Sequence, residues 1–333
     1  MPKPQPVSHF KKRSRPVVLE STGSLPLSSS PFVGGNKVDQ ACLESARAQS
    51  RTNEWIDLFS TRRTKYSMSD QPQTWHYGLV AQWWAEFNRA GREELAYYQR
   101  FIERDGQPAL DLACGTGRLL LPLLRAGLDV DGCDLSPDML ALCRQRAARD
   151  GLAPKLYVQA MHALDLPRTY RTIYICDSFG LGGQRQQDEE ALRRCYLHLV
   201  PEGTLVFSHY LPYAEAAQWS YWLPERRHEL PQAWPITGTR KQAANGDEFE
   251  LRTRLLDLDP LEQRVTQQIR VALWRAGQMI AEEEHTVQES LYFRNEVLLL
   301  LGQVGFRDVG VYAGYSGAVM TSEQTMVIFV AHK

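Results

Sequence analysis

The sequence predicts an α/β protein built on a mainly parallel sheet of seven strands, with helices on both faces and an inserted three-stranded antiparallel sheet acting as a lid. Two of three observations concern the main sheet. Short apolar runs alternate with helical patterns from 108 to 210, and a glycine turn joins the first run to the first helix. The third observation is a set of period-two runs over 247–293, which is typical of antiparallel strands.

The elements of the main sheet follow in order. Residues 75–106 read as two amphipathic helices that end at Gly106. Each apolar run after them has the length and composition of a strand buried on both faces. Ser136 is expected to cap a helix that has Pro137 at its first position. The strands expected here are 108–115, 128–134, 155–161, 172–180 and 204–210, and the helices between them are 118–127, 136–151 and 186–203.

The alternation breaks after residue 210. Residues 211–235 are rich in aromatic residues and prolines, and three strands are expected at 247–260, 262–277 and 278–293. A helix at 294–306 and strands at 307–314 and 324–333 then complete the main sheet. The lid is therefore expected to occupy 211–290, as an insertion in a doubly wound, Rossmann-like core.

The first 67 residues differ in composition from the rest. They carry eleven Lys/Arg against five Asp/Glu, with many Ser, Gly and Pro, whereas organised sequence follows Met68. The expected domains are therefore an extension at 1–67 and a folded domain at 68–333. The extension is read as a disordered tail or as not part of the native protein, with an organellar targeting peptide as a further alternative.

Composition narrows the functional classes. The body beyond residue 67 is mildly acidic, which argues against a broad nucleic-acid surface. The six cysteines form no C-x-x-C pair and no cluster with metal-ligand spacing, so we expect no metal site and a cytoplasmic location. No apolar run approaches 18 residues, so no membrane partner is expected.

The glycine turn points to a nucleoside pocket. Gly115 and Gly117 fit a G-x-G turn, but Leu120 stands where a dinucleotide fingerprint needs a third small residue. Asp134 ends the next strand beside this turn, where its carboxylate can accept both hydroxyl groups of a ribose. A nucleoside with an amino-acid tail fits better than a dinucleotide, although an NAD(P)-linked oxidoreductase and a non-catalytic nucleoside-binding module stay open.

The block D-L-A-C-G-T-G, followed by Asp134, resembles the class I S-adenosylmethionine-dependent methyltransferases, and the ends of the domain are similar to small-molecule members of that family. The resemblance implies S-adenosyl-L-methionine as cofactor and methyl transfer to a nitrogen or oxygen of a small molecule. The chain departs from the family pattern at one position, since family members often carry an acidic residue where Ala160 stands. The cofactor-binding residues that the resemblance implies are Tyr77, Asp111, Ala113, Gly115, Gly117, Asp134, Leu135, Met139, Met161, His162 and Cys176.

The acceptor is expected past the carboxyl ends of the strands. His209 is the first candidate base, because imidazole titrates near neutrality, and Tyr210 and Tyr213 come next. The alternative for His209 is a structural histidine bonded to a backbone group. The aromatic residues of 211–235 are expected to form the lid or a subunit interface, and a homodimer is possible by analogy with lidded relatives.

Overall fold

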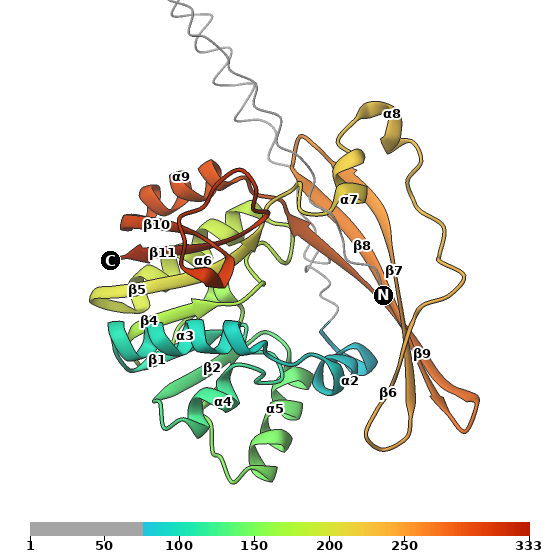
Figure 1. Ribbon diagram of the computed structural model, residues 1–333, viewed down its shortest axis with the longest axis horizontal. Helices are drawn as coiled ribbons and strands as arrows, with labels where there is room; N and C mark the ends of the chain where they lie inside the picture. The colour runs from blue at the N-terminus through green and yellow to red at the C-terminus, as the bar shows by residue number, and fades with distance from the viewer. Residues whose placement is uncertain (1–75) are drawn as a thin grey trace, which may run out of the picture. The chain divides into compact units, whose positions relative to one another are not determined.

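The computed structural model describes residues 76–333, which all lie in the compact unit Met68–Lys333. The expectations for residues 1–67 fall outside the described residues. Two sheets make up the described part: a seven-stranded sheet and a separate four-stranded antiparallel sheet (Figure 1). No helix among the described residues is long and apolar enough to cross a membrane.

The seven-stranded sheet is mainly parallel, as expected, and its strand order is β10-β11-β5-β4-β1-β2-β3. Strands β3, β2, β1, β4 and β5 pair in parallel, and β11 runs antiparallel to both β5 and β10. The chain crosses over between β1 and β4, so the sheet has a switch point there, which is where open α/β sheets bind ligands. The strands are β1 (Ala109–Leu112), β2 (Val130–Asp134), β3 (Leu156–Val158), β4 (Tyr170–Ile175), β5 (Leu199–Tyr210), β10 (Arg307–Ala313) and β11 (Met326–His332).

Helices cover both faces of this sheet, as expected. Alternate residues of a strand point to opposite sides of the sheet, so its apolar strands need a helix layer on each side. Ile173 and Ile175 of β4 join a core that includes residues of α6 and α9. Tyr174, between them, joins a second core with residues of α3, α4 and α5. The helices are α2 (Gly78–Phe87), α3 (Arg92–Asp105), α4 (Leu120–Arg125), α5 (Pro137–Arg149), α6 (Arg185–His198), α7 (Ala216–Ser220), α8 (Pro224–Arg227) and α9 (Arg294–Val304).

Some boundaries differ from the expected ones. The helix α6 ends at His198, and β5 already begins at Leu199, five residues before the expected start at 204. Tertiary pairing decides this, since Tyr170 of β4 pairs with Leu199. The third strand ends at Val158, and Met161 lies in the 3₁₀ turn η1 (Met161–Ala163). A second such turn, η2 (Gly314–Ser316), follows β10.

The second sheet has one strand more than expected. Strands β7 (Glu248–Asp259), β8 (Arg264–Arg275) and β9 (Gln278–Ser290) form the anticipated meander, and the short β6 (Thr239–Gln242) adds an edge. The four residues of β6 are exposed, so they carry no alternating apolar pattern that sequence reading could have detected.

The helix α2 links the two sheets. Its residues Leu79, Val80 and Trp83 form a core with apolar residues of β7 and β8. Its free N-terminal N–H groups bond to carboxylates from other elements: Gly78 to Asp138 of α5 at 2.8 Å and Leu79 to Glu283 of β9 at 2.7 Å. The second sheet is therefore held at the edge of the main sheet where β1, β2 and β4 end.

Candidate active site

A cavity of about 990 Å³ opens at the carboxyl ends of β1, β2 and β4. Three loops supply much of its wall. They are the turn after β1 with Ala113 and Gly115, the segment after β2 with Asp134, and the segment after β4 with Cys176 and Asp177. This cavity thus lies at the switch point of the sheet.

The turn after β1 follows an unusual backbone path. Ala113 has φ +67° and Gly115 has φ +54°, and the Ala113 N–H donates to the carbonyl of Cys133 at 2.8 Å. An L-residue such as Ala113 adopts the left-handed region only at an energetic cost. This path presents Ala113 and Gly115 to the cavity.

Leu120 and Gly117 both serve packing beside the turn. A Cβ added to Gly132 of β2 would lie 2.7 Å from Leu120 Cδ2, so a glycine in the strand accommodates the leucine that begins α4. Similarly, a Cβ on Gly117 would lie 2.6 Å from Cys143 Sγ of α5. Gly117 does not line the cavity, although its backbone holds the turn in place.

Asp134 lies next to this turn, as the sequence spacing predicts. Its two carboxylate oxygens accept backbone N–H groups from Gly115 and Ser136, each at 2.8 Å. Burial raises the pKa of Asp134, while these two bonds oppose the increase. The carboxylate is thereby fixed in position at the cavity wall, with lone pairs left for hydroxyl donors.

Most residues that the resemblance implied for the cofactor come together in this cavity. Met139 reaches it from α5, and Met161 and His162 reach it from η1. Burial lowers the pKa of His162, so the imidazole is more readily neutral. The predicted residues that line the cavity are Ala113, Gly115, Asp134, Leu135, Met139, Met161, His162, Cys176 and Tyr210.

Two further predicted cofactor residues do not line the cavity. Asp111 is buried in β1, and burial raises its pKa to about 7. Tyr77 is the N-cap residue of α2, where its carbonyl accepts N–H groups of Val80 and Ala81. The structure therefore gives both residues a place in the framework of the site, and their contact with a cofactor stays a prediction.

His209 and Tyr213 also lie outside the large cavity. The His209 ring is buried, its Nε2 lies 3.0 Å from the carbonyl oxygen of Tyr292, and burial lowers its pKa to about 4. This is the geometry of a structural histidine, the alternative that the sequence left open. Tyr213 lines a separate cavity of about 380 Å³, whereas Tyr210 does reach the large one.

A polar network at the cavity wall was missed by sequence reasoning. Arg118 follows the glycine turn and donates to both carboxylate oxygens of Glu94 at 2.6 Å; its guanidinium also lies 3.6 Å from Asp177. Tyr315, from η2, donates to Glu94 at 3.2 Å. Only the position of Arg118, directly after G-T-G, offered a signal, because Glu94 lies in an ordinary charged helix start.

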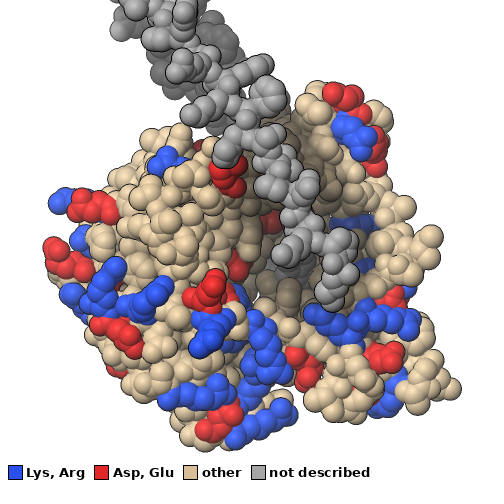
Figure 2. Space-filling view, in the orientation of Figure 1, with Lys and Arg blue, Asp and Glu red and all other residues tan. Residues whose placement is uncertain are grey.

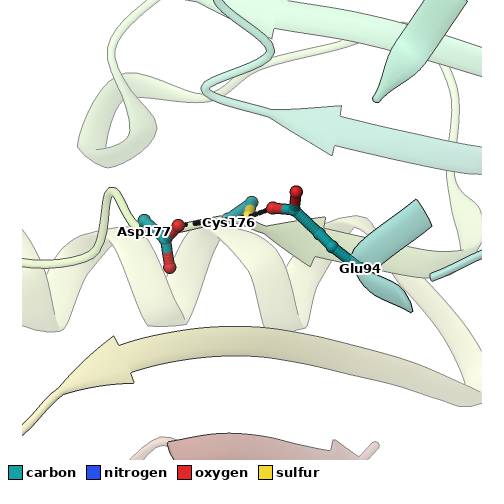
Figure 3. Close-up of side chains that lie close together, drawn as sticks. All are labelled: Glu94, Cys176 and Asp177. Carbon is teal, nitrogen blue, oxygen red and sulfur yellow. Dashed lines mark hydrogen bonds between the residues drawn. The ribbon is translucent and has the colours of Figure 1, made fainter. Parts of the chain in front are cut away.

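Cys176 sits between the two carboxylates of this network. Figure 3 shows its sulfur between Glu94 and Asp177, with Sγ 3.0 Å from a Glu94 oxygen and 3.6 Å from an Asp177 oxygen. Their ligand atoms lie within 4.8 Å of one another, close enough for a metal ion. However, Arg118 bonds Glu94, lies 3.6 Å from Asp177 and places a positive charge inside this cluster, and burial keeps the Cys176 thiol protonated by raising its pKa. The contacts account for the cluster without a metal.

The comparison with known proteins agrees with this geometry. Residues 109–203 match the family described as methyltransferase domain. The chain is 33% identical over 132 residues to dTDP-3-amino-3,6-dideoxy-alpha-D-glucopyranose N,N-dimethyltransferase of Streptomyces fradiae, covering 39% of this chain and 50% of that one. It is 34% identical over 114 residues to demethylmenaquinone methyltransferase of Thermus thermophilus, covering 33% and 50%. The chain thus spans half the length of these two relatives.

Solved structures share the fold. An S-adenosylmethionine-dependent methyltransferase from Clostridium acetobutylicum superposes with a TM-score of 0.58 at 17% identity, covering 76% of this chain and 97% of that one. The sugar N-methyltransferase KedS8 from Streptoalloteichus sp. superposes with a TM-score of 0.52 at 17% identity, covering 93% and 99%. At this identity the likeness shows the fold alone. Together with the family match, it confirms the resemblance: residues 109–203 match a methyltransferase domain, and the described part of the chain shares the fold of these methyltransferases.

Proposed function

We propose that this protein transfers a methyl group from S-adenosyl-L-methionine to a nitrogen or oxygen of a small molecule. The observation that carries the proposal is the position of Asp134. Its carboxylate is fixed by Gly115 and Ser136 at the wall of the cavity, within the segment that matches the methyltransferase domain.

The cavity offers complementary groups for each part of this cofactor. Asp134 would accept the ribose hydroxyl groups, and Leu135, which is 41% exposed, would pack on the adenine together with Met161. The amino-acid part carries one positive and one negative charge. Arg118 and the carboxylate of Asp177, which both line the cavity, supply the opposite charges.

The cavity also has room for a second molecule. Its volume of about 990 Å³ lies at the upper end of the usual range for small-ligand pockets, roughly 300–1,000 Å³. Bound S-adenosylmethionine supplies an electrophilic methyl carbon, and the protein then has to align the acceptor and exclude water. The small-molecule acceptors named for the Streptomyces fradiae relative and KedS8 support an acceptor of this size.

The surface charge supports a small acceptor as well. On the face shown in Figure 2, Lys and Arg side chains gather over the lower half, with Asp and Glu side chains lying among them. A nucleic acid needs a basic patch to bind its phosphates. Residues 68–333 carry 27 Lys and Arg against 34 Asp and Glu, and this acidic balance favours a small acceptor over a nucleic acid.

Calorimetric titration of the full-length protein with S-adenosylhomocysteine, and separately with NAD, tests the proposal. We expect binding of S-adenosylhomocysteine and a loss of about 1–3 kcal/mol in Asp134→Ala, the cost of a hydrogen bond to a charged group. Asp165→Ala is the matched control, because Asp165 is exposed and does not line the cavity. Binding of NAD alone would favour the oxidoreductase, and an unaffected Asp134→Ala would refute the ribose assignment.

A further inference from the structure

A glutamate from the second sheet lines the same cavity. Glu289, near the end of β9, is half-buried, and no hydrogen bond or ion pair joins its carboxylate to another residue of the described range 76–333. The exposed Glu93 of the wall is likewise unpaired among the described residues, whereas the buried carboxylates of the wall are bonded. Glu94 accepts bonds from Arg118, and Asp134 accepts two backbone N–H groups. Glu289 therefore has its hydrogen-bonding capacity free for a ligand.

The backbone fixes Glu289 beside the carboxyl end of β4. The Ser290 N–H donates to the carbonyl of Gly180 at 2.8 Å, and the Gly182 N–H donates to the carbonyl of Gln288 at 2.7 Å. These bonds, together with the bridge between Leu181 and Glu289, attach the end of β9 to the segment that follows Cys176 and Asp177. Glu289 thus reaches the edge of the sheet where an acceptor is expected.

The surroundings of Glu289 favour a cation. Burial, together with a smaller contribution from the nearby carboxylate of Asp188, raises the pKa of Glu289 to about 7. Asp188 is itself buried and accepts a bond from the Tyr292 hydroxyl at 2.8 Å. The charge of Arg185 lowers the pKa of Asp188. However, the Arg185 guanidinium donates to the carbonyl of Leu291 and pairs with Glu296 rather than with Glu289. A positive charge brought by a ligand would relieve the uncompensated charge of Glu289.

We infer that Glu289 binds the methyl acceptor and that this acceptor is an amine whose ammonium group pairs with the carboxylate. The inference rests on the proposed methyltransferase function and narrows its acceptor from nitrogen or oxygen to nitrogen. An ammonium group has to lose a proton before its nitrogen can be methylated. In that transfer the N–H bond breaks, the electron pair stays on nitrogen, and a Glu289 oxygen forms the O–H bond. A carboxyl group that titrates near neutral pH can accept such a proton.

Matched amine and alcohol probes test the inference on the full-length protein saturated with S-adenosylhomocysteine. The pairs are glucosamine with glucose, and benzylamine with benzyl alcohol, and binding is followed by saturation-transfer NMR and calorimetry. We expect at least one amine to bind about tenfold or more tightly than its alcohol. This preference disappears in Glu289→Gln and persists in Glu282→Gln, an exposed glutamate of the same strand that does not line the cavity.

The outcomes separate the two proposals. An amine preference that survives in Glu289→Gln, or that is absent from the wild type, overturns the role of Glu289. Titration of S-adenosylhomocysteine alone tests the underlying function, since failure of the wild type to bind it would refute the methyltransferase. Because Glu289→Gln is expected to bind S-adenosylhomocysteine as tightly as the wild type, this titration also shows that the variant is folded.

Discussion

Replacing Arg118 by methionine should strongly destabilise the folded protein. Arg118 is 17% exposed in its side chain and Glu94 is 9% exposed, so the ion pair is largely shielded from water. Arg118→Met keeps most of the apolar stem but leaves the Glu94 carboxylate without its cation. Removing one partner of a buried pair costs about 3–5 kcal/mol. Since Arg118 keeps some contact with water, we expect about 3 kcal/mol, which is roughly a 150-fold change in the folding equilibrium.

The pH dependence gives this prediction a second readout. Burial by itself would raise the Glu94 pKa, but bonds from Arg118 and Cys176 and the charge of Arg118 bring it below the usual value. Because the Glu94 pKa is lower in the folded state than in the unfolded state, Glu94 stabilises the folded protein at pH values above its unfolded pKa of about 4.5. This contribution is lost as the pH falls through the folded-state pKa. The deficit of Arg118→Met should therefore be largest above about pH 5 and shrink in acid.

Urea unfolding of the full-length protein between pH 4 and pH 8 measures both effects. Arg193→Met is the matched control, because Arg193 pairs with Glu189 and Glu190 on the exposed surface of α6. Such pairs contribute about 0–1 kcal/mol. The double variant Glu94→Gln with Arg118→Met should recover part of the loss, because no charge remains unpaired. A loss below about 1 kcal/mol, or one that does not change with pH, would refute the reasoning.

Three further predictions concern residues around the site. His209→Phe should retain binding of S-adenosylhomocysteine. In the wild type the pKa of His209 is about 4 in the folded state and 6.5 in the unfolded state, so the protein should lose about 3 kcal/mol of stability as the pH falls from 6.5 to 4. Urea unfolding of the variant should not show this loss. Gly180→Ala should destabilise the folded protein by at least about 1 kcal/mol more than Gly246→Ala. Both glycines have a positive φ, but of the two only Gly180 would bring a Cβ against backbone, 2.8 Å from the Ser290 carbonyl oxygen. Equal thermal stability of the two variants would contradict this prediction. Ala113→Gly should stabilise the folded protein by roughly 0.5 kcal/mol, because relief of the left-handed φ of +67° outweighs the greater entropy of glycine in the unfolded chain. In the same denaturation experiment the control Ala141→Gly, on the exposed face of α5, should cost about 1 kcal/mol of stability.

Local patterns in the sequence determined the main sheet and the position of the proposed cofactor site. Strands buried on both faces read as apolar runs, and β1, the glycine turn and Asp134 are adjacent in sequence and in space. The contact between Asp134 and Gly115 follows from this short path, which sequence spacing can represent. The same holds for the cap of α5, where Ser136 accepts the N–H of Met139 as its pattern predicts.

Long-range contacts decided the rest. Glu94, Arg118, Asp177 and Tyr315 come from distant segments, and no local pattern indicates that they form one network. The direction of a strand residue at the sheet edge is equally a tertiary property: His209 points to the carbonyl of Tyr292, and the next residue, Tyr210, faces the cavity. Glu289 reaches the site only because β9 pairs with the segment after β4, more than a hundred residues earlier in the chain. The sequence by itself thus determined which cofactor pocket to expect, whereas the packing of the second sheet on the first decided which further side chains line the cavity.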